Sequence, residues 1–396
     1  MKRLLRTSLL LLGSLLVSLA IVEVVLRVIN FSNPSFYTSD PFTGGAHRPG
    51  AKGWWTAEGP GWVEINSRGQ RDREHSEAKP PGTFRIAVLG DSYAEAFQLP
   101  MEQSFWSVLE QRLNGDGAIG GRKAEVLNFG VSGYGTAQEL LALRHRVWAF
   151  DPDLVLLTVT TGNDVRNNAK ALEGNPGIPY FNLEGNRLSL DAGYRSMWRY
   201  RAPWRQVIAA VSSLSDHFRI VQLANRARHA YLARTAAQRL AEAAVRTAAE
   251  TGLDEMVFRP PADPAWRDAW AVTEALIAQM DREVRGRGAR FLVATLSSGI
   301  QVHPDPKVRE AFAAQLGVPD LYYPDRRLAA FCGTAGIPSV SLAPGLALVA
   351  TERQLFLHGF GRTLGSGHWN ADGHRLAGER LAEVIRELYV AGRATE

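Results

Sequence analysis

The chain has 396 residues, of which 45% are hydrophobic and 21% charged. This globular composition excludes wholesale disorder and collagen-like or low-complexity classes, and the length suits two or three domains or one large α/β domain. The formal net charge is +5 without any block of five like charges, which we interpret as a salt-bridged surface; an anionic partner such as polysaccharide or phospholipid is the alternative. No recognition motif accompanies the charge, so nucleic acid is not expected as a partner. The single cysteine, Cys332, excludes an intramolecular disulfide.

The first 30 residues have the composition of a membrane segment. Three basic residues precede an uncharged, largely apolar run at 7–22, and the apolar stretch continues to Ile29. These 23 residues would form about 34 Å of helix, enough to cross a bilayer. Glu23 and Arg27 interrupt the run but are four residues apart, so they can pair on one helix face.

We therefore expect residues 1–30 to form an uncleaved, single-pass membrane anchor. Because basic residues flank its first end, that end should stay in the cytoplasm and the remaining chain should be exported to the periplasm. The alternative is a cleaved signal peptide and a secreted protein, since Ser18-Leu19-Ala20 offers small residues at a suitable spacing.

After the anchor, a lead-in at 31–84 is rich in Pro, Gly and aromatic residues, and we predict that it packs on the main domain with little regular structure. Predicted strands and helices then alternate along the chain. Short apolar runs predict strands at 85–89, 125–129, 154–159, 289–296 and 338–342. Helical periodicity predicts helices at 102–113, 136–148, 264–285, 308–315, 325–335 and 370–390. Thr136 is the predicted N-cap of the second helix, with Glu139 completing a capping box.

Continuous apolar strands separated by helices predict a parallel sheet that is covered on both faces. This alternation of strands and helices is interrupted at about 165–262, where we predict a mostly helical insertion with a small hairpin at 182–188 and helical sequence at 207–251. The predicted organisation is thus an anchor at 1–30, a lead-in at 31–84, and one α/β domain at 85–396 that the insertion interrupts.

Four loops carry polar residues at the ends where ligands bind in such sheets. They are Gly90-Asp91-Ser92-Tyr93, Gly130-Val131-Ser132-Gly133-Tyr134-Gly135, Thr161-Gly162-Asn163-Asp164 and Gly365-Ser366-Gly367-His368-Trp369-Asn370. These residue types suit acyl transfer. A serine hydroxyl such as that of Ser92 becomes a nucleophile when a base, here His368, removes its proton. The Gly133 N–H, the Asn163 amide and the Ser92 N–H can stabilise the resulting oxyanion.

Taken in order, these four loops resemble the motifs of the SGNH (GDSL) hydrolase superfamily. The resemblance covers about 84–165 and 288–390, and Thr161 stands where the family usually has glycine. It implies a flavodoxin-like three-layer sandwich with a five-stranded parallel sheet. It also implies Ser92 as nucleophile, His368 as base, and an oxyanion hole formed by Ser92, Gly133 and Asn163.

One departure from the family concerns the acid that orients the histidine. The family usually carries an aspartate three residues before the histidine, and some relatives carry it two before, but this chain has Gly365 and Ser366 there. Three hypotheses follow: a backbone carbonyl or water orients His368, giving a dyad; an acid from elsewhere substitutes; or the site is weak, altered or dead. The candidate acids are Asp305, Asp325 and Asp372.

Other residues have simpler interpretations. Ser132 is a rival nucleophile and His358 a weaker candidate for the base, whereas Asp91, Asp164, Trp369 and His374 are expected to have structural roles. We expect no metal and no cofactor, because the nine histidines lack paired ligand spacing and no phosphate-binding or dinucleotide-binding glycine loop opens the first helix of the α/β domain.

The sequence therefore predicts a membrane-anchored serine esterase or deacylase that acts on an ester, with an O-acetyl group as one option, through an acyl-serine intermediate. The expected substrate is an acylated small molecule or polysaccharide, and the N-terminal helix makes the membrane a second partner. One alternative is an O-acetyltransferase that modifies cell-envelope polysaccharide. The other is a non-catalytic binding or assembly protein with an eroded site.

Overall fold

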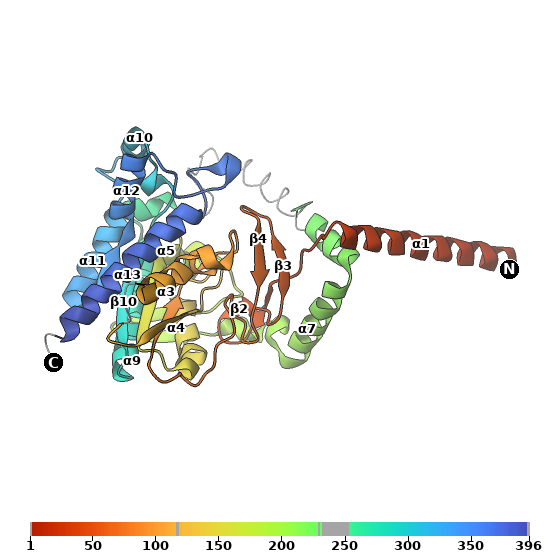
Figure 1. Cartoon of the computed structure of the whole chain (residues 1–396), viewed down its shortest axis with the longest axis horizontal. Coiled ribbons are helices and arrows are strands. Elements are labelled where there is room, and N and C mark those ends of the chain that lie inside the picture. The colour runs from red at the N-terminus through yellow and green to blue at the C-terminus, as the bar shows by residue number, and fades with distance from the viewer. Residues whose placement is uncertain (1, 116–118, 229, 232–252, 394–396) are drawn as a thin grey trace.

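A five-stranded parallel sheet forms the centre of the protein (Figure 1). The computed structural model describes residues 2–115, 119–228, 230–231 and 253–393. The strands are β5 (Thr83–Leu89), β6 (Lys123–Asn128), β7 (Leu154–Thr160), β10 (Arg290–Leu296) and β11 (Ser339–Ser341). They lie in the order β11-β10-β7-β5-β6, which is the 2-1-3-4-5 order of a flavodoxin-like sheet. The predicted fold class is confirmed, and each predicted strand lies within two residues of an observed one.

Side chains of β7 show why this sequence forms a central strand. The strand is buried along its whole length, and successive residues point to opposite faces of the sheet. Val155 and Leu157 belong to the core between the sheet and helices α4 (Thr136–His145) and α9 (Pro264–Gly286). Leu156 belongs to a second core on the other face, formed with α3 (Phe105–Gly115), α12 (Leu342–Arg353) and α13 (Ala371–Arg393). The result is a three-layer sandwich.

Other helices complete the domain. They are α2 (Ser92–Glu95), α5 (Asp164–Asn167), α6 (Lys170–Glu173), α10 (Pro306–Leu316) and α11 (Tyr323–Ala335). Single 3₁₀ turns occur at Met101–Gln103, Val147–Phe150, Gly193–Ser196, Trp198–Tyr200, Glu255–Phe258, Ile300–Val302 and Gly361–Thr363.

Two local predictions about helices are wrong. Gly135, not Thr136, is the N-cap of α4, and the Gly135 N–H donates to Gln138 Oε1 at 3.2 Å. Glu139 is fully buried and does not close a capping box. Helix α12, which begins directly after β11, was not predicted, because its first turn contains Pro344 and Gly345, residue types that obscure helical periodicity.

The insertion combines helical segments with one hairpin. Strands β8 (Tyr180–Glu184) and β9 (Arg187–Asp191) pair antiparallel, which confirms the predicted hairpin. Helix α7 (Ala202–His217) follows, and a further helical stretch occupies 219–228. The rest of the predicted helical sequence, at 232–251, lies outside the described residues.

The lead-in is more regular than predicted. It forms two antiparallel hairpins, β1 (Tyr37–Asp40) with β2 (Gly44–His47), and β3 (Lys52–Trp55) with β4 (Gly61–Glu64). These strands of only four residues gave no recognisable alternation in the sequence. A small core of Phe36, Val63, Ile65 and Phe97 joins the lead-in to the segment after α2.

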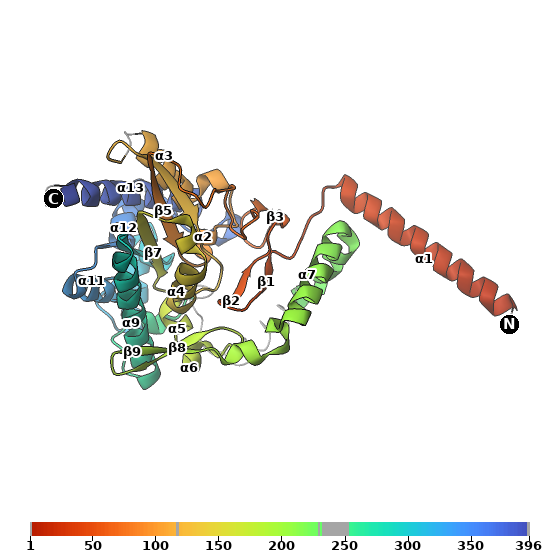
Figure 2. The same ribbon diagram turned by 90° about the horizontal axis from the view of Figure 1, so that it is seen from below.

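The N-terminal helix α1 (Lys2–Val28) projects away from the body of the protein (Figures 1 and 2). Its residues Arg3–Val28, with a mean hydropathy of 2.7, are long and apolar enough to cross a membrane, although a signal sequence passes the same test. The predicted pair is present, since Arg27 Nε donates to Glu23 Oε1 at 2.8 Å.

We predict that Gly61→Ala destabilises the fold. A Cβ at Gly61 would lie 2.1 Å from the Phe97 carbonyl oxygen, so the β3–β4 hairpin would have to move away from the main domain. The free energy of unfolding, measured with denaturant, should fall by about 1–3 kcal/mol. Gly45→Ala is the matched control, because no atom lies within 4 Å of the corresponding Cβ. Equal stability of the two variants would contradict this account of the packing.

Candidate active site

Ser92 is the first residue of α2 and lies at the carboxyl edge of the sheet, after the turn at Gly90 and Asp91 that follows β5. The turn is fixed by Asp91, whose Oδ1 accepts from the Tyr93 N–H and from Thr160 Oγ1, both at 3.0 Å. Gly90 is required because a Cβ there would lie 2.2 Å from Thr158 Oγ1 on β7. Close packing of β5 against β7 therefore presents Ser92 at the start of α2.

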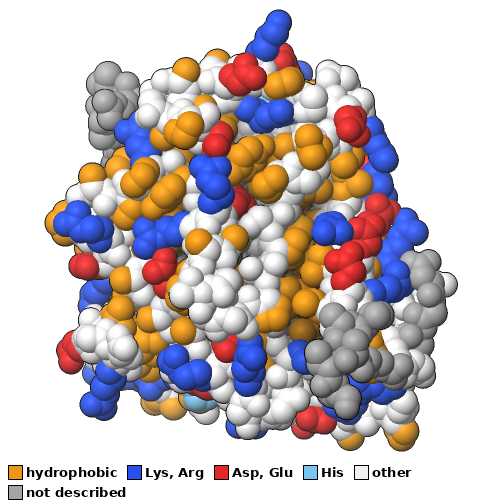
Figure 3. Space-filling model, turned by 90° about the vertical axis from the view of Figure 1, so that its left-hand side faces the viewer, with side chains coloured by type: hydrophobic (Ala, Val, Ile, Leu, Met, Phe, Trp, Pro, Cys, Tyr) orange, Lys and Arg blue, Asp and Glu red, His pale blue; other side chains and the backbone are white. Residues whose placement is uncertain are grey.

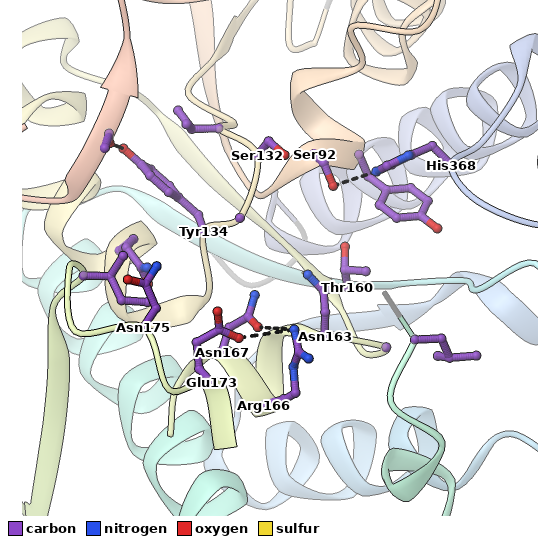
Figure 4. Close-up of a pocket in the computed structure, with 18 of the residues that line it drawn as sticks. Ser92, Ser132, Tyr134, Thr160, Asn163, Arg166, Asn167, Glu173, Asn175 and His368 are labelled. Carbon is purple, nitrogen blue, oxygen red and sulfur yellow. Dashed lines mark hydrogen bonds and ion pairs between the residues drawn. The ribbon is translucent and has the colours of Figure 1, made fainter. Parts of the chain in front are cut away.

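A hydrogen-bonded chain of three side chains includes Ser92. Ser92 Oγ lies 2.8 Å from His368 Nε2, and His368 Nδ1 lies 2.8 Å from Glu58 Oε2 (Figure 4 shows the Ser92–His368 bond). The carboxylate accepts a hydrogen bond from the Nδ1–H group of His368, which leaves the lone pair on Nε2 facing the serine hydroxyl. This is the tautomer that a general base needs.

The carboxylate that contacts His368 comes from the lead-in, and none of the three predicted candidate acids occupies that position. Asp305 caps α10 by accepting from the Lys307 N–H at 2.9 Å. Asp325 is buried and accepts from Thr295 Oγ1 at 2.8 Å and Gln301 Nε2 at 2.9 Å, and burial raises its pKa to about 6. Asp372 pairs with Arg375 at 2.9 Å. Since Glu58 occupies Nδ1 of His368, the hypothesis of a dyad oriented by a carbonyl or water is also wrong.

Glycines allow the turn that carries Glu58 to pack closely against the main domain. The turn joins β3 to β4, and a Cβ at Gly59 would lie 2.3 Å from the Gln98 carbonyl oxygen. On the opposite side, Gly367 has a φ of +85°, and a Cβ there would lie 3.0 Å from Glu58 Oε1. The available sequence signal was therefore a carboxylate inside the stretch Glu58-Gly59-Pro60-Gly61, which by itself does not distinguish a catalytic turn from an ordinary one.

The negative charge of Glu58 and the positive charge of protonated His368 stabilise each other. Burial alone would lower the pKa of His368, but the hydrogen bond and negative charge of Glu58 outweigh it and raise that pKa above 6.5. Burial alone would raise the pKa of Glu58, but the hydrogen bond to His368 and its charge bring that pKa below 4.5. The two side chains are 30% and 32% exposed, so solvent reaches the pair.

A second histidine supports the loop that carries His368. His358 is buried, which lowers its pKa to about 3 and keeps it neutral. Its Nδ1 donates to the Gly367 carbonyl oxygen at 2.7 Å, so its Nε2 accepts from Ser297 Oγ at 3.0 Å. Ser297 Oγ in turn accepts from Trp369 Nε1 at 2.9 Å. His358 thus lies behind the site rather than acting as its base.

All three groups predicted to form the oxyanion hole line one cavity of about 430 Å³, together with His368. The N–H groups of Ser92 and Gly133 have no hydrogen-bond partner among the described residues, so both are available to a ligand. Asn163 donates through Nδ2 to Asp91 Oδ2 at 3.3 Å, which fixes the amide at the cavity wall. In Figure 4, Ser92, Asn163 and His368 face the same space.

The far side of this cavity is polar. Arg166 Nη2 lies 3.2 Å from Glu173 Oε2, and Asn167 and Asn175 also line the wall (Figure 4). Ser132, the rival nucleophile, lines the cavity too, and its N–H donates to Glu95 Oε1 at 3.0 Å. The cavity wall beyond Ser92 therefore offers hydrogen-bonding groups to a polar part of a ligand.

Several remaining polar residues have structural positions. Asp164 and Glu139 are fully buried, and burial raises the pKa of both carboxyls well above the usual value. His374 is buried and its Nδ1 accepts from the Phe105 N–H at 3.1 Å, as expected for a packing residue. Among the described residues, no group of three or more His, Cys, Asp or Glu side chains could hold a metal ion.

Comparisons with known proteins gave only distant likenesses. No family model and no curated protein matches the chain. The solved structure of TesA is similar at 14% identity and a TM-score of 0.36, covering 77% of this chain and 99% of that one. A GDSL-like lipase from Bacteroides thetaiotaomicron gives 11% and 0.34, with coverages of 80% and 93%. A catalytic mutant of an acetylxylan esterase from Geobacillus stearothermophilus gives 11% and 0.38, with 79% and 96%. Identities and TM-scores this low carry no conclusion about activity.

We predict that Glu58→Gln lowers the pKa of His368. The substitution removes the negative charge that stabilises the imidazolium and keeps a side chain of similar size. Titration of the His368 ring signals by NMR should therefore give a midpoint above 6.5 in the wild type and a lower midpoint in the variant. Glu64→Gln is the control, because Glu64 lies on the same hairpin but pairs with Lys52 at 2.7 Å. An unchanged His368 midpoint in Glu58→Gln would refute the contact.

Proposed function

We propose that the protein hydrolyses carboxylic esters through an acyl-serine intermediate. The observation that carries the proposal is the unbroken hydrogen-bonded chain from Glu58 through His368 to Ser92, beside the N–H groups of Ser92 and Gly133, which have no partner in the part of the chain that the structure describes. Nucleophile, base and orienting acid are the three roles that this chemistry requires.

In the first half of the reaction, Ser92 Oγ attacks the ester carbonyl carbon while His368 Nε2 takes the hydroxyl proton. The carbonyl oxygen becomes an oxyanion, which the N–H groups of Ser92 and Gly133 and the Asn163 amide stabilise. Collapse of this intermediate breaks the bond to the alkoxy group, which leaves with the proton from His368. The acyl group remains on Ser92.

In the second half, water repeats the sequence. His368 takes a proton from water, the hydroxide oxygen attacks the acyl carbon, and the Ser92 oxygen leaves and regains the proton. Glu58 keeps its charge throughout and stabilises the imidazolium in both halves. Because the base must be neutral before each attack, activity should rise with pH through the raised pKa of His368.

The position of Glu58 also bears on the two alternatives. The hypothesis of an eroded, non-catalytic site rested on the missing aspartate, and the Glu58–His368 hydrogen bond takes away that reason. Transfer to a hydroxyl acceptor, as in an O-acetyltransferase, uses the same residues with an alcohol in place of water. The polar wall at Arg166, Glu173 and Asn175 is compatible with such an acceptor.

We also propose that α1 anchors the enzyme in the membrane with the rest of the chain in the periplasm. The apolar stretch within α1 supports anchoring, and the basic residues before it support this orientation.

The test of the proposed nucleophile is chemical labelling of the full-length protein in detergent. A fluorophosphonate should add one adduct to the wild type by intact mass, and Ser92→Ala should remove both the adduct and the hydrolysis of short-chain aryl esters. Ser132→Ala is the matched control, because Ser132 lines the same cavity and should keep the adduct. Loss of activity by about 10³-fold or more is expected for Ser92→Ala. An adduct that persists in Ser92→Ala would contradict the proposal.

Product analysis separates hydrolysis from transfer. Release of free acid at a rate independent of added oligosaccharide supports hydrolysis. An oligosaccharide product heavier by one acyl group would instead assign transfer to the same site.

A further inference from the structure

The C-terminal end of α1 is hydrogen-bonded to the C-terminal end of α7 and to the chain just after it. Arg27 Nη2 donates to the His217 carbonyl oxygen at 2.6 Å, and the Ile220 N–H donates to Glu23 Oε2 at 3.0 Å. Phe218, which lies between His217 and Ile220, is 48% exposed. If α1 crosses a bilayer, the chain around Phe218 therefore lies at the level where α1 leaves it.

Exposed apolar side chains gather in this part of the protein. Outside α1, fourteen large hydrophobic side chains are markedly exposed among the described residues, and eight of them lie between 198 and 231. These eight are Trp198, Trp204, Val207, Val211, Phe218, Val221, Leu223 and Tyr231. By contrast, the face of the molecule turned away from α1 mixes apolar and charged side chains (Figure 3). A clustered set of this size is the mark of an interaction surface.

The cluster has the geometry of an interfacial helix. Trp204, Val207 and Val211 are spaced by three and four residues, so they lie along one flank of the 16-residue helix α7. Trp198 packs edge-on against Trp204 with ring centroids 5.7 Å apart. In both Figure 1 and Figure 2, α7 runs across the line of α1 rather than along it. A helix placed so would lie along the surface of the bilayer that α1 crosses.

Basic residues accompany the apolar flank. Arg201, Arg226 and Arg228 are exposed, and the Arg226 guanidinium lies 5.8 Å from the centroid of the Phe31 ring, just beyond the end of α1. Arginine beside exposed Trp and Phe is the composition that binds the headgroup region of anionic membranes.

The side of α7 next to this flank faces the main domain, since Ile208 is four residues from Trp204 and three from Val211. Ile208 and Ser212 border a hollow of about 390 Å³ between α7 and the β1–β2 hairpin. This hollow shares four lining residues with the catalytic cavity, namely Tyr37, Gly45, Asn175 and Ile178. Helix α7 thus stands between the membrane end of α1 and the approach to Ser92.

From these observations we propose that residues 198–223, which comprise the turn before α7, the exposed flank of α7 and the start of the next helical stretch, dock onto the surface of the membrane that anchors the chain. The occupant of the flank is the lipid headgroup and upper acyl region. This inference rests on the proposed crossing of the membrane by α1, but not on the proposed esterase activity.

Site-directed spin labelling of the full chain tests the docking. The only cysteine, the buried Cys332, is replaced by alanine, and single cysteines are introduced at Val211, Phe218, Leu12 in α1, and Leu348 on α12. Each protein is reconstituted in vesicles of phosphatidylcholine and phosphatidylglycerol. We expect labels at Val211 and Phe218 to collide more with oxygen than with a water-soluble nickel chelate, as the Leu12 label does. The 66%-exposed Leu348 site is the matched control and should show the reverse.

Each outcome decides the proposal. If labels at Val211 and Phe218 collide more with the nickel chelate, as at Leu348, while the Leu12 label collides more with oxygen, docking is overturned and the anchor stands. A Leu12 label in water would overturn both. Dipolar broadening at Val211 that disappears on dilution with unlabelled protein would assign the flank to a second copy of the chain instead. Hydrolysis of a soluble ester, measured on the same samples, reports separately on the proposed function.

Discussion

The hydrogen bond between Glu58 and His368 joins two parts of the chain that are 310 residues apart in sequence. It gives the imidazole its tautomer, raises its pKa, and makes the lead-in part of the candidate active site. The lead-in is held in place by its packing on Phe97 and by glycines that permit close approach. A small hairpin outside the α/β domain therefore influences the protonation of His368, the proposed base.

The sheet supplies the other constraint. Parallel strands end at one edge, so the loops after β5, β6 and β7 bring Ser92, Gly133 and Asn163 to one cavity. The loop before α13 adds His368, which the buried group of His358, Ser297 and Trp369 supports from behind. The fold thus places the backbone of Ser92, Gly133, Asn163 and His368 close together, so that their side chains and N–H groups reach the same cavity.

The elements whose sequence signal is local could be predicted. The buried strands, the hairpin at 180–191 and the order of the polar loops follow from hydrophobic runs and from the chemistry of parallel sheets. Helix α12, whose first turn carries Pro344 and Gly345, was not predicted, and Asp305, Asp325 and Asp372 were predicted as acids in place of Glu58. The acid could not be found because its partnership with His368 depends on how the lead-in packs, and no spacing between residues 58 and 368 encodes that packing.

The most direct test of this account is the rate of inactivation by a fluorophosphonate as a function of pH, for the wild type and Glu58→Gln. The wild-type rate should rise with a midpoint above 6.5, the raised pKa of His368. In Glu58→Gln the midpoint should move to lower pH and the plateau rate should fall by about 10²- to 10⁴-fold. Equal plateaus with the same midpoint would show that Glu58 does not support His368 and would contradict the account.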